Sequence, residues 1–111
     1  MREKMNIDEL ADEVYRWADK RFPDRDSSQC WEKLKEEVDE LFKAPTDGRE
    51  YADVFILLLD LAAMNGIDLE TVILTKLEIN KMSDWIKDGN VMRRVKVEAI
   101  DNIAKHHYPE E

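Results

Sequence analysis

A nearly continuous apolar stretch in the middle of the chain decides the fold. Residues 51–64 read YADVFILLLDLAAM, so the centre of this segment is apolar on almost every side of a helix. A helix that is apolar all round lies at the centre of a protein. Asp47 and Glu50 have the spacing of a capping box, and Asn65-Gly66 is a typical helix end. The sequence therefore predicts a buried central helix that begins near Gly48 and needs a partner subunit to be covered fully.

Further helices are predicted around this segment by apolar residues that recur at helical spacing. Their expected ranges are residues 7–21, 29–42 and 69–86. Asn6 is the expected cap of the first, and Ser27 or Ser28 that of the second. The tail from Val91 to His107 is expected to form a fifth helix, although its first residues also have strand character. This pattern predicts an all-α fold, a four- to five-helix bundle of the kind that short loops connect.

Length and composition limit the classes of protein to consider. The chain has 111 residues, which predicts a single domain over 1–111, with a core at about 6–87 and a tail at 88–111. The net charge of -9 and the single short basic patch at Arg93–Lys96 argue against binding to a nucleic-acid polymer. No apolar run is long enough to span a membrane or to act as a signal peptide, so the cytoplasm is the expected location.

Five acidic residues on two of the predicted helices form the strongest chemical signal. They are Glu36, Glu37 and Glu40, followed by Glu50 and Asp53. Residues three or four apart share a helix face, so an antiparallel pair of helices can bring these carboxylates together. Converging carboxylates repel each other unless a hard cation, Mg²⁺ or Mn²⁺, neutralises them. The alternative is a solvated acidic face, but Asp53 adjoins the apolar run, where a carboxylate needs a partner.

The acidic residues and the segments that follow them resemble the MazG-like all-α nucleotide pyrophosphohydrolases. The family signature EExxE, then ExxD, is matched by residues 36–40 and 50–53. A second family segment, K-x-x-x-N-x-x-R-x-W, is matched by Lys76, Asn80 and Trp85. The resemblance runs from about Trp17 to Trp85. Within the family, the chain is most similar to the small, MazZ-like dATP/dGTP pyrophosphohydrolases of phages and bacteria.

This resemblance implies a role for each matched residue. The implied metal ligands are Glu37, Glu40, Glu50 and Asp53. Glu36 is implied as a further ligand or as the residue that orients water, with Glu36 or Glu37 accepting its proton. The implied substrate contacts are Lys76, Asn80 and Trp85. Ser83 departs from the family pattern, which has Arg there, and Lys81 or the pair Arg93-Arg94 are the candidates to supply that charge.

The resemblance also implies the reaction. It is the Mg²⁺-dependent hydrolysis of a nucleoside triphosphate to a monophosphate and pyrophosphate. The implied substrate is a purine deoxynucleotide, dATP or dGTP, and Mn²⁺ can replace Mg²⁺. The family implies a homodimer or a homotetramer. Two alternatives remain at this point: a non-enzymatic helical interaction module, and a related hydrolase that acts on dUTP, dCTP or a modified nucleotide.

Four aromatic residues have two interpretations. Tyr15, Trp17, Phe22 and Trp31 could stack on a purine base. Trp17 and Trp31 fall on the apolar faces of their predicted helices, so for these two the sequence favours a place in the core.

Overall fold

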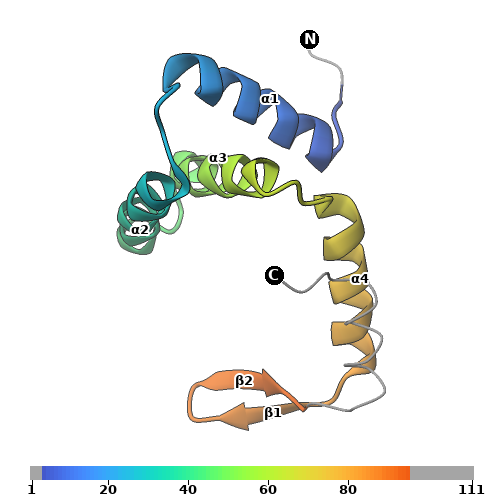
Figure 1. Ribbon diagram of the computed structural model, residues 1–111. Helices are drawn as coiled ribbons and strands as arrows, with labels where there is room; N and C mark the ends of the chain where they lie inside the picture. The colour runs from blue at the N-terminus through green and yellow to red at the C-terminus, as the bar shows by residue number, and fades with distance from the viewer. Residues whose placement is uncertain (1–3, 96–111) are drawn as a thin grey trace. The chain divides into compact units, whose positions relative to one another are not determined.

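The computed structural model describes residues 4–95, which form four helices and one β-hairpin (Figure 1). The chain divides into two units, Met1–Asp68 and Leu69–Glu111, and each is described by itself. The first contains α1 (Ile7–Arg21), α2 (Ser27–Lys43) and α3 (Gly48–Met64). The second contains α4 (Leu69–Met82), β1 (Trp85–Asp88) and β2 (Val91–Arg94). The predicted predominantly helical fold is confirmed.

The starts of the first two helices show how local polar residues set their bounds. Helix α1 begins where the sequence predicts, because the side chain of Asn6 accepts a hydrogen bond from the backbone N–H of Glu9 at 2.9 Å. The predicted cap of α2 was wrong: it is Asp26, one residue before Ser27. Asp26 accepts from the backbone N–H of Gln29 at 2.9 Å, and the Gln29 side chain accepts in return from the Asp26 N–H at 3.1 Å. This reciprocal capping box satisfies two otherwise unpaired donors, which a serine cap alone would not do.

Helix α3 is the common partner of α1 and α2, which both lie against it (Figure 1). Cys30 and Leu34 of α2 are buried against Val54 and Leu61 of α3. Cys30 is a buried free cysteine and packs in the hydrophobic core as a small apolar residue.

A Schellman motif ends α3. The N–H of Ile67 bonds to the carbonyl of Ala62 at 3.0 Å, and the N–H of Gly66 bonds to that of Ala63 at 3.1 Å. Gly66 adopts φ +66°, a conformation that other residues rarely adopt. The predicted helix stop at Asn65-Gly66 is therefore confirmed.

The central helix keeps apolar side chains exposed. Phe55 and Leu58 of α3 are 54% and 39% exposed, so residues 4–95 do not reach the all-round burial expected of this helix. The preference for a core position of the two tryptophans was wrong as well. Trp17 is 56% exposed and Trp31 is 50% exposed.

The second unit departs from the expected continuous helices. Helix α4 ends at Met82 and not near Ile86, and Trp85–Asp88 pairs antiparallel with Val91–Arg94. Gly89 has φ +62° and takes the first place of the two-residue loop, as in a type II′ hairpin turn. The expected fifth helix is therefore wrong over residues 91–95: Val91–Arg94 form a strand, in line with the strand character noted in the sequence, and Val95 is not helical. Its remaining residues, 96–107, lie outside the described part of the chain.

None of the helices within residues 4–95 has both the length and the apolar character required to cross a bilayer.

Candidate active site

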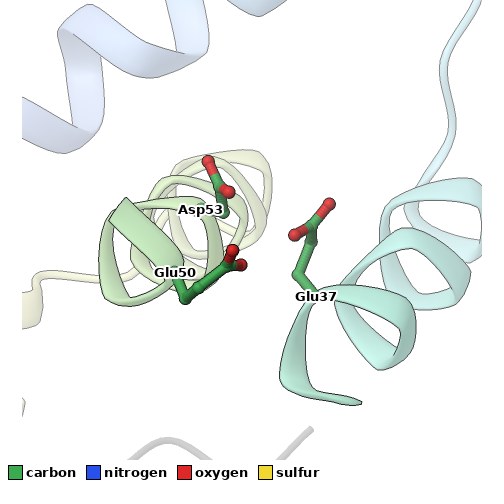
Figure 2. Close-up of side chains that lie close together, drawn as sticks. All are labelled: Glu37, Glu50 and Asp53. Atoms are coloured by element: carbon green, nitrogen blue, oxygen red, sulfur yellow. The ribbon is translucent and has the colours of Figure 1, made fainter. Parts of the chain in front are cut away.

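Three carboxylates from two helices converge in the first unit. Glu37 projects from α2 and Glu50 from α3 towards each other, and Asp53 of α3 lies next to Glu50 (Figure 2). One oxygen from each of the three lies within 4.8 Å of the others. The local sequence spacing places Glu50 and Asp53 on one face of α3. Only the packing of α2 against α3 adds Glu37, which lies far from them along the chain.

The cluster is electrostatically crowded. Glu37 and Glu50 are partly buried, whereas Asp53 is exposed. Burial, together with the negative charge of Asp53, raises the pKa of the Glu50 carboxyl above its ordinary value. One ammonium group offsets part of this charge: Nζ of Lys33 lies 3.2 Å from Oε1 of Glu37 and 3.5 Å from Oε2 of Glu36. Its hydrogen bond to Glu37 raises the pKa of Lys33. Such a cluster is suited to hold a hard divalent cation.

The two other predicted acidic residues lie at the margin of the cluster. Glu36 and Glu40 line the same acidic hollow, which has a volume of about 440 Å³ and also contains Glu37, Glu50 and Asp53. The Glu36 side chain is 69% exposed, and Glu40 is also an exposed residue. Within the part of the chain that the structure describes, neither belongs to the group of carboxylates that meet within 4.8 Å.

A second, largely apolar hollow, here named the aromatic hollow, adjoins the acidic one. It lies between α1 and α3, has a volume of about 740 Å³ and is lined by Trp17, Phe22 and Ile56. Glu37 and Asp53 line this hollow too, so the two hollows share these carboxylates. The rings of Trp17 and Phe22 meet edge to face, with their centroids 5.8 Å apart. The half-exposed Trp17 therefore presents an aromatic surface beside the carboxylate cluster, whereas Trp31 lines neither hollow.

A buried ion pair lines a third hollow, of about 470 Å³, to which the loop between α1 and α2 also contributes. Nε and Nη2 of Arg25 donate to the two carboxylate oxygens of Asp60 at 3.0 and 2.8 Å. The two side chains are 9% and 5% exposed. Asp60 also accepts from the Cys30 thiol at 3.8 Å. The hydrogen bonds from Arg25 to Asp60, and the negative charge of that carboxylate, raise the pKa of the guanidinium. The sequence left the partner of Asp60 open, because nothing local relates two residues 35 positions apart.

The predicted substrate contacts lie in the second unit. Lys76 and Asn80 are one turn apart on α4, and the indole N–H of Trp85 donates to the backbone carbonyl of Asn80 at 2.9 Å. The structure therefore brings Asn80 and Trp85 together. The buried Oδ1 of Asn80 has no hydrogen-bond partner among residues 4–95.

The residues considered as replacements for the family arginine already have partners. Ser83, at the arginine position, is buried and donates to the carbonyl of Ile79 at 2.6 Å. Lys81 pairs with Glu78 at 3.3 Å, and Arg93 pairs with Asp88 at 2.9 Å. Both ion pairs are exposed, so Lys81 and Arg93 can leave these partners for another anion at little cost in free energy.

Comparison with known proteins identifies close relatives. A protein called dATP/dGTP diphosphohydrolase from Salmonella phage PMBT28 is 40% identical over 95 residues, which are 80% of this chain but 33% of that longer protein. A protein of the same name from Cyanophage S-2L is 38% identical over 92 residues, 80% of this chain and 88% of its own length.

A solved structure from the same cyanophage is similar in fold. It is a MazG-like pyrophosphohydrolase bound to dGDP and three catalytic Mn²⁺ ions per active site. It superposes with a TM-score of 0.74 at 38% identity, over 83% of this chain and 94% of its own. The family model for dATP/dGTP pyrophosphohydrolases matches residues 10–103. On this evidence, the chain belongs to the dATP/dGTP pyrophosphohydrolase family.

Proposed function

We propose that this protein hydrolyses a purine deoxynucleoside triphosphate, dATP or dGTP, to the monophosphate and pyrophosphate in the presence of divalent cations. The observation that carries this proposal is that Glu37 and Asp53 line both the acidic and the aromatic hollow. A single ligand can therefore place its phosphates at the carboxylates and its base beside Trp17. The names of the two phage relatives, and the dGDP bound to the cyanophage enzyme, support a purine deoxynucleotide.

The donor atoms fit a hard divalent cation. Glu37, Glu50 and Asp53 offer only carboxylate oxygens, and no His or Cys among residues 4–95 joins the cluster; this set suits Mg²⁺ and Mn²⁺. We assign these three as ligands, with Glu40 as a fourth from the edge of the same hollow. A cation held there would neutralise phosphate charge and lower the pKa of a bound water. The three Mn²⁺ ions of the cyanophage enzyme support a site for more than one ion, with Mg²⁺ as the proposed physiological choice.

The chain's own residues have distinct tasks in the proposed reaction. Water attacks the α-phosphorus, Glu36 or Glu37 accepts its proton, and the bond to the pyrophosphate oxygen breaks. Lys76 donates to the negative charge that develops on the leaving pyrophosphate. Asn80, whose buried Oδ1 has no partner within the described chain, and Trp85 complete the substrate contacts.

We also propose that the protein acts as a homodimer or a homotetramer. Phe42, Phe55 and Leu58 are 82%, 54% and 39% exposed, which leaves apolar side chains of α2 and α3 in contact with water. Association between copies would bury this surface and supply stability that a short chain lacks. Light scattering coupled to size exclusion should give a mass of two or four chains, and a monomer at micromolar concentration would contradict this assignment.

A nucleotide panel tests the reaction. The purified protein is incubated with each ribo- and deoxynucleoside triphosphate, with Mg²⁺, with Mn²⁺ and with EDTA, in ¹⁸O-labelled water. The proposal expects metal-dependent release of pyrophosphate, with the label in the monophosphate and the fastest turnover for a purine deoxynucleotide. Release of a diphosphate, or the label in pyrophosphate, would contradict attack at the α-phosphorus. Faster turnover of dUTP or dCTP would correct the base, and inertness towards all nucleotides would favour the non-enzymatic interaction module.

Two isosteric variants test the site. Glu37→Gln removes a charged oxygen from the cluster and should lower turnover by more than about 100-fold, because it deletes a metal ligand. Glu32→Gln makes the same chemical change on the same helix, at an exposed residue that pairs with Lys35. This control should retain normal turnover. Equal activity of the two variants would contradict the assignment of Glu37.

A further inference from the structure

Lys33 occupies a position that connects the separate parts of the site. It lies on α2 one turn before Glu37, and its side chain lines the acidic hollow, the aromatic hollow and the third hollow. Among the residues lining the acidic and aromatic hollows in the described chain, it is the single cationic one. The point at which the two hollows meet is lined by Lys33, Glu37 and Asp53.

Lys33 neutralises part of the carboxylate charge through an ion pair that a bound cation would replace. Its Nζ lies 3.2 Å from the Glu37 carboxylate, which is itself 15% exposed and belongs to the cluster with Glu50 and Asp53. The Lys33 side chain is 58% exposed, so its ammonium can turn to solvent or to another anion, and i, i+4 ion pairs on a helix are weak. A divalent cation at Glu37 carries twice the charge of the ammonium and repels it. Metal binding and the Lys33–Glu37 ion pair are therefore competing arrangements of the same carboxylate.

The released ammonium would have a suitable ligand nearby. A nucleotide with its base in the aromatic hollow and its terminal phosphates in the acidic hollow carries its α-phosphate at their junction, beside Lys33. A lysine on a flexible four-carbon stem binds phosphate oxygens as a point charge. We propose that Lys33 is a phosphate-binding residue that exchanges the Glu37 carboxylate for the α-phosphate of the nucleotide when divalent cations bind.

This inference rests on the proposed function and predicts two opposite effects of one substitution. Lys33→Met removes the competing ammonium, so Mn²⁺ should bind the nucleotide-free protein about two- to fivefold more tightly, the range expected for loss of an exposed ion pair. The same variant should lose about 10–100-fold in kcat/KM for the preferred nucleotide, the effect of one missing charge-assisted hydrogen bond. A purely structural role for Lys33 would not strengthen Mn²⁺ binding.

Lys35→Met is the matched control. Lys35 is on the same helix, forms an ion pair with Glu32 at 3.2 Å, is 73% exposed and lines none of the three hollows. Its loss should change neither quantity. Lys33→Arg keeps the charge and should retain most of the turnover.

Mn²⁺ affinity is measured by calorimetric titration without nucleotide, and kcat/KM by pyrophosphate release. Unchanged or weaker Mn²⁺ binding in Lys33→Met would overturn the exchange with Glu37. Unchanged kcat/KM in that variant, with active wild type, would overturn the phosphate contact. A wild-type protein inert towards every nucleotide would instead mark the failure of the proposed function, and the phosphate contact would fail with it.

Discussion

Removal of the buried carboxylate from the Arg25–Asp60 pair should be among the most destabilising isosteric changes in the chain. Asp60→Asn preserves the shape of the side chain but leaves the guanidinium, which is 9% exposed, without its bidentate partner. Breaking one side of a buried ion pair costs about 3–5 kcal/mol, because the remaining charge stays desolvated. A domain of this length loses at least about 4 °C in Tm per kcal/mol, so Tm should fall by at least about 10 °C.

The same guanidinium offers a control. Nη1 of Arg25 lies 3.3 Å from Asp19, whose side chain is 60% exposed. Asp19→Asn removes a charge from the same arginine where water replaces the lost partner, so the cost should stay below about 1 kcal/mol. Urea and thermal unfolding, followed by circular dichroism, measure both variants. Equal losses in stability for Asp60→Asn and Asp19→Asn would refute the reasoning that burial decides the cost.

A double substitution distinguishes the unpaired charge from lost packing. Arg25→Met together with Asp60→Leu removes both charges and keeps apolar volume at both positions. Such replacements of buried pairs are often neutral or stabilising. The double variant should therefore recover most of the stability that Asp60→Asn loses, and it keeps the test decisive if the single variant does not fold. A double variant no more stable than the single one would indicate that packing and not charge explains the loss.

Three further predictions concern the carboxylate cluster, the aromatic hollow and the end of α3. The pKa of Glu50 is raised in the folded state, so this residue stabilises the metal-free protein at low pH, and its contribution is lost as pH rises through the folded pKa. Mn²⁺ affinity should rise over the same pH window, because the carboxyl becomes charged. Calorimetric titrations across pH 4–7 test this, and pH-independent Mn²⁺ binding would contradict it. Trp17→Ala should raise KM for the purine nucleotide by about 5–100-fold through lost stacking, whereas Trp31→Ala should not, and equal KM values would exclude Trp17 as the base platform. Gly66→Ala should destabilise the protein by about 1–2 kcal/mol, because φ is +66° at this residue. Gly48→Ala should be neutral or stabilising, because φ is not positive there and no atom lies within 4 Å of the added methyl group. Urea midpoints that fall equally for both variants would refute this.

Local sequence information was sufficient to predict the start of a helix where only one nearby residue is a good cap. Helix α1 could be predicted to the residue, because Asn6 is the single good cap before an amphipathic run that Phe22 and Pro23 end. The start of α2 could not, since Asp26, Ser27 and Ser28 are all capping residues and only the reciprocal bond with Gln29 selects the first. The start of α3 at Gly48 was also predictable, but the predicted capping box was wrong: the Asp47 side chain accepts from the backbone N–H of Arg49 at 3.0 Å and not from that of Glu50.

The β-hairpin shows the limit of periodicity. Val91 and Val95 are spaced as on a helix, so helical and strand patterns compete over this short segment. The turn at Gly89, with φ +62°, and the pairing of Trp85 with Arg94 select the strand. Pairing between strands is a contact between separate segments, and it decides such cases over local preference.

The sequence by itself determined the helical class, the spacing of the acidic residues and the family, because helix faces and motifs follow from residues a few positions apart. It also placed Glu50 and Asp53 on one face of α3. Only the tertiary structure decided that Glu37 meets them while Glu36 and Glu40 stay at the margin. It also decided that Trp17 is exposed beside the cluster and that Arg25 meets Asp60 across 35 residues. These features depend on how helices pack against one another, which is set by the sum of many weak contacts between distant segments and leaves no pattern along the chain.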